Sequence, residues 1–116
     1  MAVTYNTVID QGADWYITFY YDNPDGTPVN ITSYTAALQL RTSPLAKTTV
    51  LSLSTGGNGI TINGAQGRID VHATNIQTTA ITNGKYSYDL EITSPQNVVT
   101  RLVQGTIEVS PQTTRT

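Results

Sequence analysis

The chain contains one histidine, His72, and an aspartate, Asp70, lies two residues before it. Alternate residues of a β-strand point to the same face, so these two side chains could touch. Nucleophilic catalysis also needs an activated serine, threonine or cysteine beside the histidine, and no nucleophile motif accompanies the pair. A metal site would need two or three further ligands. We therefore interpret Asp70 and His72 as solvated residues on the outer face of a strand.

The other acidic residues and the glycine-rich loops give no stronger indication of chemistry. The segment 22–26, DNPDG, weakly resembles a calcium loop, but an EF-hand would need an acidic residue where Tyr21 stands and a later glutamate. The loops at 56–59 and 64–67 lack the Lys-Ser/Thr pair and the helix of a phosphate-binding loop. The carboxylates show no spacing typical of a glycosidase pair. We expect no catalytic residues, no cofactor, no metal and no small-molecule substrate.

Exposed tyrosines are the best candidates for a binding surface. Tyr16 and Tyr20 lie on the opposite side of their predicted strand from the apolar row, and Tyr5 lies in the first strand. Tyrosine is enriched at protein interfaces because its ring is large and carries a hydroxyl group. The segment 27–32 could instead cover Tyr16 and Tyr20 within the domain. We name Tyr5, Tyr16 and Tyr20 as the candidate partner interface.

The composition favours one domain with a weakly charged surface. Of the 116 residues only 12% are charged, the formal net charge is −2, and the basic residues are scattered, which argues against a nucleic-acid partner. No apolar run approaches the roughly 18 residues that cross a bilayer, so we expect no membrane partner. The N-terminal residues lack the features of a signal peptide, and there is no cysteine for a disulfide framework.

Alternation of apolar and polar residues predicts an all-β fold. The clearest case is 85–93, in which Tyr86, Tyr88, Leu90 and Ile92 share one face. Gly105 suggests a bulge in the last strand, and 74–81 has the spacing of one or two helical turns. Strands are expected at 2–9, 14–22, 35–41, 48–54, 60–62, 68–72, 85–93 and 98–110. We predict one β-sandwich domain over residues 1–110, followed by a polar tail over 111–116.

Four segments in order resemble a family of small tailed-bacteriophage virion structural proteins, and they are also similar to the N-terminal β-sandwich of baseplate upper proteins. The segments are QGADW at 11–15, NPDGTPVNITSYTA at 23–36, GKYSYDLEI at 84–92 and GTIEVSP at 105–111. This resemblance covers nearly the whole chain. It implies a non-enzymatic building block of a virion, with no catalytic residues to carry over. The chain shows no receptor-binding or coiled-coil extension of the kind found in baseplate upper proteins, which favours an adaptor or decoration role.

We therefore expect an immunoglobulin-like two-sheet sandwich of seven or eight short antiparallel strands, with at most one short helical turn. The expected function is that of a baseplate or tail-fibre attachment protein, located in the virion tail or baseplate rather than the capsid and made in the host cytoplasm. Its partners would be other virion proteins and copies of itself. The alternatives are a capsid cement protein, and a carbohydrate- or calcium-binding module that uses Tyr16, Tyr20 and the Asp22–Asp25 turn.

Overall fold

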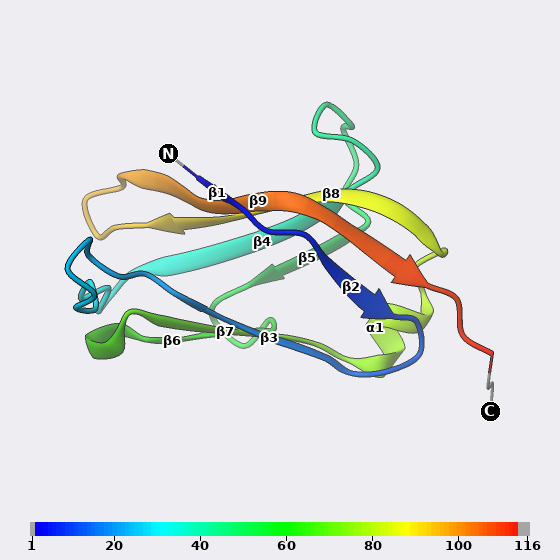
Figure 1. Cartoon of the computed structure of the whole chain (residues 1–116), viewed down its shortest axis with the longest axis horizontal. Helices are drawn as coiled ribbons and strands as arrows, with labels where there is room; N and C mark the ends of the chain where they lie inside the picture. The colour runs from blue at the N-terminus through cyan, green and yellow to red at the C-terminus, as the bar shows by residue number, and fades with distance from the viewer. Residues whose placement is uncertain (1, 114–116) are drawn as a thin grey trace.

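The computed structural model describes residues 2–113, which form two β-sheets packed face to face (Figure 1). The larger sheet has the strand order β1-β9-β8-β4-β5, with β2 also paired to β9, and the smaller sheet has the order β3-β7-β6. The strands are β1 (Val3–Thr4), β2 (Thr7–Asp10), β3 (Trp15–Tyr20), β4 (Thr35–Arg41), β5 (Leu51–Ser54), β6 (Ile60–Asn63), β7 (Arg68–Ala73), β8 (Gly84–Thr93) and β9 (Val99–Ser110).

The core lies between the sheets and is built from the alternating apolar rows. In β8 the side chains of Tyr86, Tyr88, Leu90 and Ile92 point inward and are buried, while the residues between them are partly exposed. The inner rows of β4 and β7 follow the same alternation, which is the pattern expected when only one face of each sheet is covered. The alternation in the sequence therefore reports the two faces correctly.

The connectivity is immunoglobulin-like. Within the smaller sheet, β3, β7 and β6 take the places of strands B, E and D, whereas β4, β8 and β9 of the larger sheet take those of C, F and G. The phenol of Tyr86, near the start of β8, donates a hydrogen bond to the backbone carbonyl of Thr82, four residues earlier. This is the arrangement of a tyrosine corner. The expected two-sheet sandwich is thus confirmed.

The first strand differs from the expectation. Instead of one strand over 2–9, the chain forms β1 and β2, separated at Tyr5 and Asn6, so the described residues contain nine strands rather than seven or eight. Both pair with β9 in parallel rather than antiparallel orientation. Parallel neighbours need a long connection between them, and here almost the whole chain provides it, because β1 and β9 are the first and last strands.

The bulge in the closing hairpin lies three residues before the expected position. Leu90 pairs with Val103 and Glu91 pairs with Arg101, so Leu102 is the extra residue. The extra residue exchanges the inward and outward positions along β9. Leu102 and Val103 can therefore both pack against the core, although adjacent residues fall on opposite faces of a regular strand. Gly105 is instead regularly paired with Tyr88.

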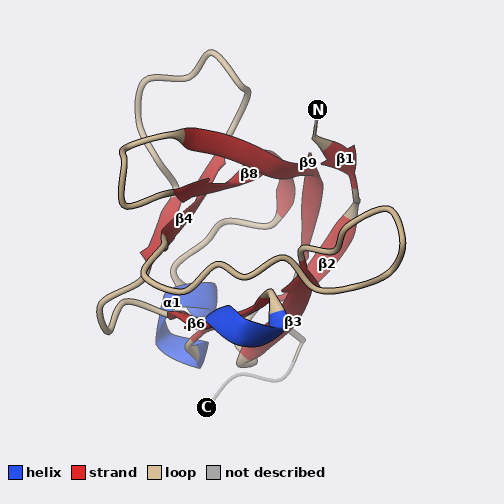
Figure 2. Cartoon of the chain, turned by 90° about the vertical axis from the view of Figure 1, so that its left-hand side faces the viewer, coloured by secondary structure: helices blue, strands red, loops and turns tan. Residues whose placement is uncertain are grey.

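Residues 2–113 contain two short helices, where at most one was expected. The helix α1 (Asn75–Thr79) lies within the predicted segment 74–81 and begins with a capping box between Thr74 and Gln77. The 3₁₀ helix η1 (Gly64–Gln66) replaces a predicted turn. Both lie at the level of the smaller sheet (Figure 2). After β9, the Gln112 backbone N–H donates to the Gln11 side chain; residues 114–116 of the predicted tail lie outside the described residues.

Candidate protein-binding site

An apolar groove of about 550 Å³ runs between β1 and β3. We call it the edge groove, because it lies where the margins of the two sheets face each other. Two of the predicted interface residues line it, Tyr5, which is 49% exposed, and Tyr20, which is 65% exposed. Its other apolar lining residues include Val3, Ile17, Phe19 and Leu102. An exposed groove with this lining is suited to binding another protein.

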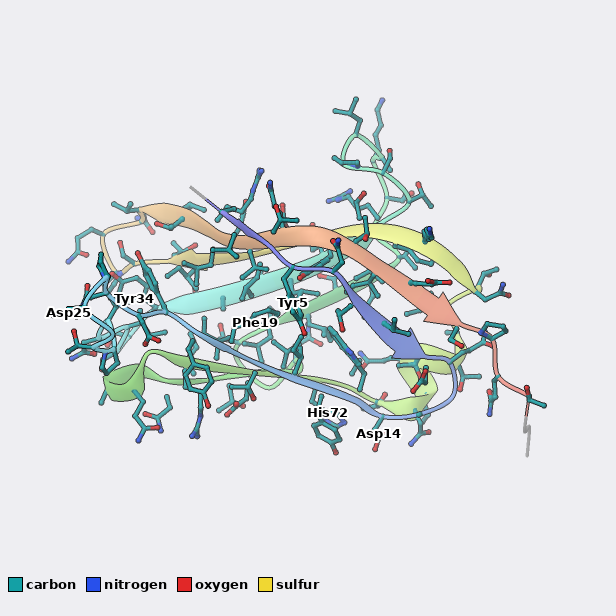
Figure 3. All side chains as sticks on the ribbon, viewed as in Figure 1. Tyr5, Asp14, Phe19, Asp25, Tyr34 and His72 are labelled. Carbon is teal, nitrogen blue, oxygen red and sulfur yellow. The ribbon has the colours of Figure 1, made fainter. Side chains whose placement is uncertain are left out.

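Contacts within the domain hold Tyr5 in place at this groove. Its ring meets the ring of Phe19 edge to face, with centroids 6.4 Å apart and planes at 90° (Figure 3). Its backbone N–H donates to the Gln104 carbonyl at 2.9 Å. Its own carbonyl accepts a hydrogen bond of 2.6 Å from the phenol of Tyr88. The Tyr5 anchor is thus pre-positioned, which lowers the entropy lost on binding.

The Tyr88 phenol links the groove to the core. Its ring is buried between the sheets, and this burial, together with the nearby Tyr5, raises the pKa of Tyr88 to about 12. Loss of the phenolic proton would put a charge in the core and remove the donor to Tyr5. The geometry of the groove therefore depends on a neutral Tyr88.

Tyr16 is exposed but lies outside the groove. Its ring stacks on the imidazole of His72 on the outer face of the smaller sheet, with centroids 4.3 Å apart and planes within 4° of parallel. The segment 27–32 does not cover Tyr16 or Tyr20, which are 70% and 65% exposed. Tyr5 and Tyr20 therefore both line the edge groove, whereas Tyr16, which shares the outer face of β3 with Tyr20, does not.

The residues considered for catalysis make separate contacts. His72 lies 4.0 Å from the carboxylate of Asp14, not beside Asp70. Figure 3 shows His72 and Asp14 on the outer side of the smaller sheet. Asp70 instead contacts the Arg68 guanidinium at 3.3 Å and accepts a hydrogen bond from the Thr18 hydroxyl at 2.8 Å. Asp14 and Thr18 come from β3 and the residue just before it, so spacing along β7 could not reveal these two contacts, whereas Arg68 lies on β7 itself.

The carboxylate of Asp25, in the turn after β3, makes its hydrogen bonds within that turn. Asp25 accepts hydrogen bonds from the Thr27 hydroxyl at 2.6 Å and from the Thr27 backbone N–H at 3.0 Å. These bonds, that of the hydroxyl most strongly, lower the pKa of the Asp25 carboxyl. Within residues 2–113, His, Asp and Glu side chains form no group of three or more that could hold a metal ion.

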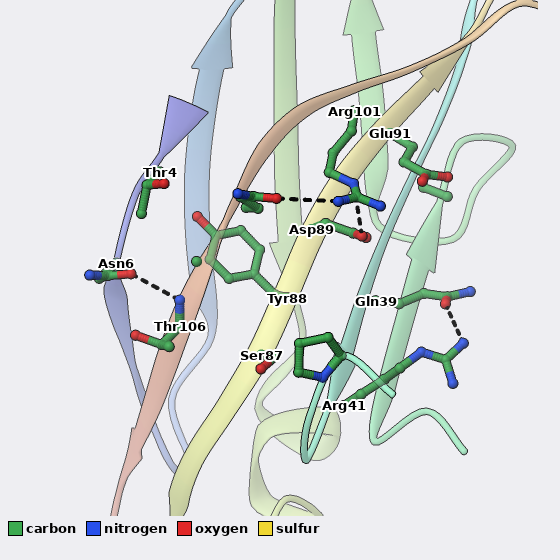
Figure 4. Close-up of a pocket in the computed structure, with 14 residues that line it drawn as sticks. Thr4, Asn6, Gln39, Arg41, Ser87, Tyr88, Asp89, Glu91, Arg101 and Thr106 are labelled. Carbon is green, nitrogen blue, oxygen red and sulfur yellow. Dashed lines mark hydrogen bonds and ion pairs between the residues drawn. The ribbon is translucent and has the colours of Figure 1, made fainter. Parts of the chain in front are cut away.

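A second depression, of about 570 Å³, lies on the outer face of the larger sheet and is lined mostly by polar and charged residues. We call it the polar groove (Figure 4). Arg101 lies 3.5 Å from the Asp89 carboxylate and donates to Gln104 at 3.3 Å, while Arg41 donates to Gln39 at 2.8 Å. This site cannot be found from the sequence alone, because its residues come from the three strands β4, β8 and β9. The signal available was only the polar outer row of β8.

No protein family model and no curated protein matches the chain. Among solved structures, it is similar to Drosophila OTK, extracellular domains 3–5, with a TM-score of 0.41, 15% identity, and coverage of 92% of this chain and 33% of that chain. It is also similar to a family 123 glycoside hydrolase from Clostridium perfringens, with a TM-score of 0.35, 14% identity, and coverage of 94% and 23%. The chain thus spans a third or less of these proteins, and neither similarity assigns a function. No helix among residues 2–113 is long and apolar enough to cross a membrane.

Proposed function

We propose that the protein is a non-enzymatic structural component of a tailed-phage virion and acts through protein–protein packing at the edge groove. The observation that supports binding is the apolar groove between β1 and β3, with Tyr5 and Tyr20 exposed along it. Rigid, partly exposed tyrosines beside an apolar depression are typical of the residues that dominate interface energies. The virion location, at the baseplate or tail-fibre attachment, follows from the resemblance of the four segments described above.

The rigidity of the groove suits an adaptor. Tyr5 is fixed by three contacts, and Phe19 and Tyr20 lie on the regular strand β3, so little ordering is needed when a partner binds. A central interface tyrosine typically contributes about 2 kcal/mol or more when truncated. We expect Tyr20→Ala to abolish stable incorporation into the particle while the isolated domain keeps its fold.

Site-specific photocrosslinking in purified particles tests this proposal. A photoreactive phenylalanine analogue is placed at position 20, and in a matched control at position 76, because Ile76 is 79% exposed on α1. We expect position 20 to crosslink to a virion protein and position 76 to give much less product. A protein absent from purified particles would refute the virion location. Equal crosslinking at both positions would refute the edge groove as the interface.

The polar groove favours one second candidate, a carbohydrate-binding domain. Arg41, Arg101, Asp89 and Gln39 offer donors and acceptors on a shallow surface, as recognition of sugar hydroxyls requires. Titration with cell-wall polysaccharide of the host bacterium, followed by amide NMR shifts, tests this candidate. Shifts confined to β4, β8 and β9 and lost in Arg101→Ala would support it, whereas unchanged spectra at saturating polysaccharide would exclude it.

A further inference from the structure

β3 is a free sheet edge without the usual protection. Among residues 2–113 it pairs only with β7, and its six residues, WYITFY, include no charge and no proline. Natural edge strands are normally short, charged or interrupted, because an open edge recruits other strands. The other edges fit that rule: β5 and β6 have four residues each, and Tyr5 and Asn6 interrupt the β1–β2 edge. β3 is therefore the edge best suited to strand addition.

Hydrogen bonds next to β3 show which of its backbone groups are available. The Tyr21 N–H donates to the Gly67 carbonyl at 2.8 Å, one step beyond the pair Tyr20–Arg68. In an antiparallel ladder this places Tyr20 in a non-hydrogen-bonded pair, and pair types alternate along the strand. The odd-numbered residues of β3 therefore bond to β7. The N–H and C=O groups of Tyr16, Thr18 and Tyr20 point toward the free edge.

The edge formed by these three residues can pair with the same edge of a second copy, with Thr18 at the centre. If a second β3 lies antiparallel with Thr18 opposite its counterpart, Tyr16 faces Tyr20 of the partner subunit, and the reverse pair forms by symmetry. Both aromatic pairs would lie on the outer face, where cross-strand aromatic contacts stabilise a sheet. A two-fold interface requires such a self-matching patch. The smaller sheets of two copies would become one six-stranded sheet.

We infer that a second copy of this chain pairs with β3 through Tyr16, Thr18 and Tyr20, giving a two-fold dimer. This inference rests on the proposed function, since it names the partner at the edge groove and its adjoining face. The neighbouring acidic residues agree with a limited pairing: in this register Asp14 faces Asp22 of the partner subunit at each end. Their repulsion confines the contact to residues 16–20 and opposes open-ended sheet growth. Added salt should therefore strengthen the dimer.

Charge pairing across the edge tests the register. The first variant is Tyr16→Lys with Tyr20→Lys, which places lysine opposite lysine. The second is Tyr16→Lys with Tyr20→Glu, which places lysine opposite glutamate in the same register. Both variants lose both tyrosines and the Tyr16–His72 stack, so they are matched. The first raises the formal net charge from −2 to 0 and the second leaves it at −2. Repulsion between the net charges of two molecules would thus favour association of the Lys/Lys variant, which is the opposite of the result that the proposed register predicts.

Sedimentation velocity from about 1 μM to about 1 mM protein measures the association, since these concentrations span weak to moderate affinities. We expect a dimer in the wild type, and an association about tenfold or more tighter for the Lys/Glu variant than for the Lys/Lys variant. Far-ultraviolet circular dichroism confirms that both variants are folded. A wild type that stays monomeric, or two variants that associate equally, would overturn the inference. A monomer whose position 20 still crosslinks to another virion protein would overturn the dimer alone and leave the proposed function standing.

Discussion

Gly105→Ala should destabilise the domain by about 2–3 kcal/mol. A Cβ atom at position 105 would lie 2.3 Å from the backbone carbonyl oxygen of Tyr5 and 2.7 Å from the Asn6 side-chain oxygen. The contacting Tyr5 oxygen belongs to the backbone, which cannot rotate away as a flexible side chain can. The segment between β1 and β2 must therefore move away from β9. The backbone of Gly105 does not have positive φ, so its substitution carries no strain of that kind.

The magnitude follows from the hydrogen bonds that this movement breaks. Each contributes about 1 kcal/mol net, and three cross the displaced contact: Tyr5 N–H to the Gln104 carbonyl, Thr106 N–H to Asn6 Oδ1, and the Tyr88 phenol to the Tyr5 carbonyl. In a strand without the clash, replacing glycine by alanine would instead raise the free energy of unfolding by about 0.5–1 kcal/mol. The two cases therefore predict changes of opposite sign.

Urea unfolding followed by circular dichroism measures the change in the free energy of unfolding, and thermal unfolding measures the corresponding change in Tm. For a domain of this size, 1 kcal/mol corresponds to about 4 °C in Tm, so the variant should melt about 8–12 °C lower. The control is Tyr88→Phe, which should cost about 1 kcal/mol in the wild type and much less in the Gly105→Ala background, because the bond to Tyr5 is already lost. A Gly105→Ala variant as stable as the wild type would refute the reasoning.

Two further predictions concern buried polar groups. Because burial raises the pKa of Tyr88 to about 12 from 10.0, its contribution to stability should be complete below pH 10 and lost between pH 10 and 12; ultraviolet titration of the phenols, compared with Tyr88→Phe, checks this. Thr78 is fully buried, and its hydroxyl accepts from Gly12 N–H and donates to the Ala13 carbonyl, so Thr78→Val should cost about 1–3 kcal/mol in urea unfolding. A fully stable valine variant would contradict that role.

Much of the fold could be predicted because alternation reports the two faces of a strand directly. The strand over Thr35–Arg41 was predicted with the bounds that the structure has, and the inward rows of β4 and β8 are correct. The parallel pairing of β1 and β2 could not be found in this way, because periodicity does not say which strands are neighbours. The predicted position of the bulge, at Gly105, was also wrong, and the extra residue is Leu102. An extra residue at either position would explain the same change of face, so the sequence pattern could not distinguish them.

The candidate site was predictable only in part. Tyr5 and Tyr20 were chosen as exposed aromatic residues, and both line the edge groove. Tyr16 was chosen for the same reason but stacks on His72, a contact that depends on the register of β3 against β7. The groove itself arises from two free sheet margins facing each other. Local sequence contains no signal for that arrangement.

The pairing of the first strands with the last has a consequence for the order of folding. Asn6 accepts its hydrogen bond from Thr106, a partner 100 residues later, and β2 has no other strand partner than β9 in the described chain. During synthesis, the N-terminal strands must therefore wait until β9 has left the ribosome. Contacts this distant in sequence slow folding, because a long loop must close before they form. Until then, the margin later filled by β1 and β2 is open, and the newly made chain is most exposed to mispairing at that stage.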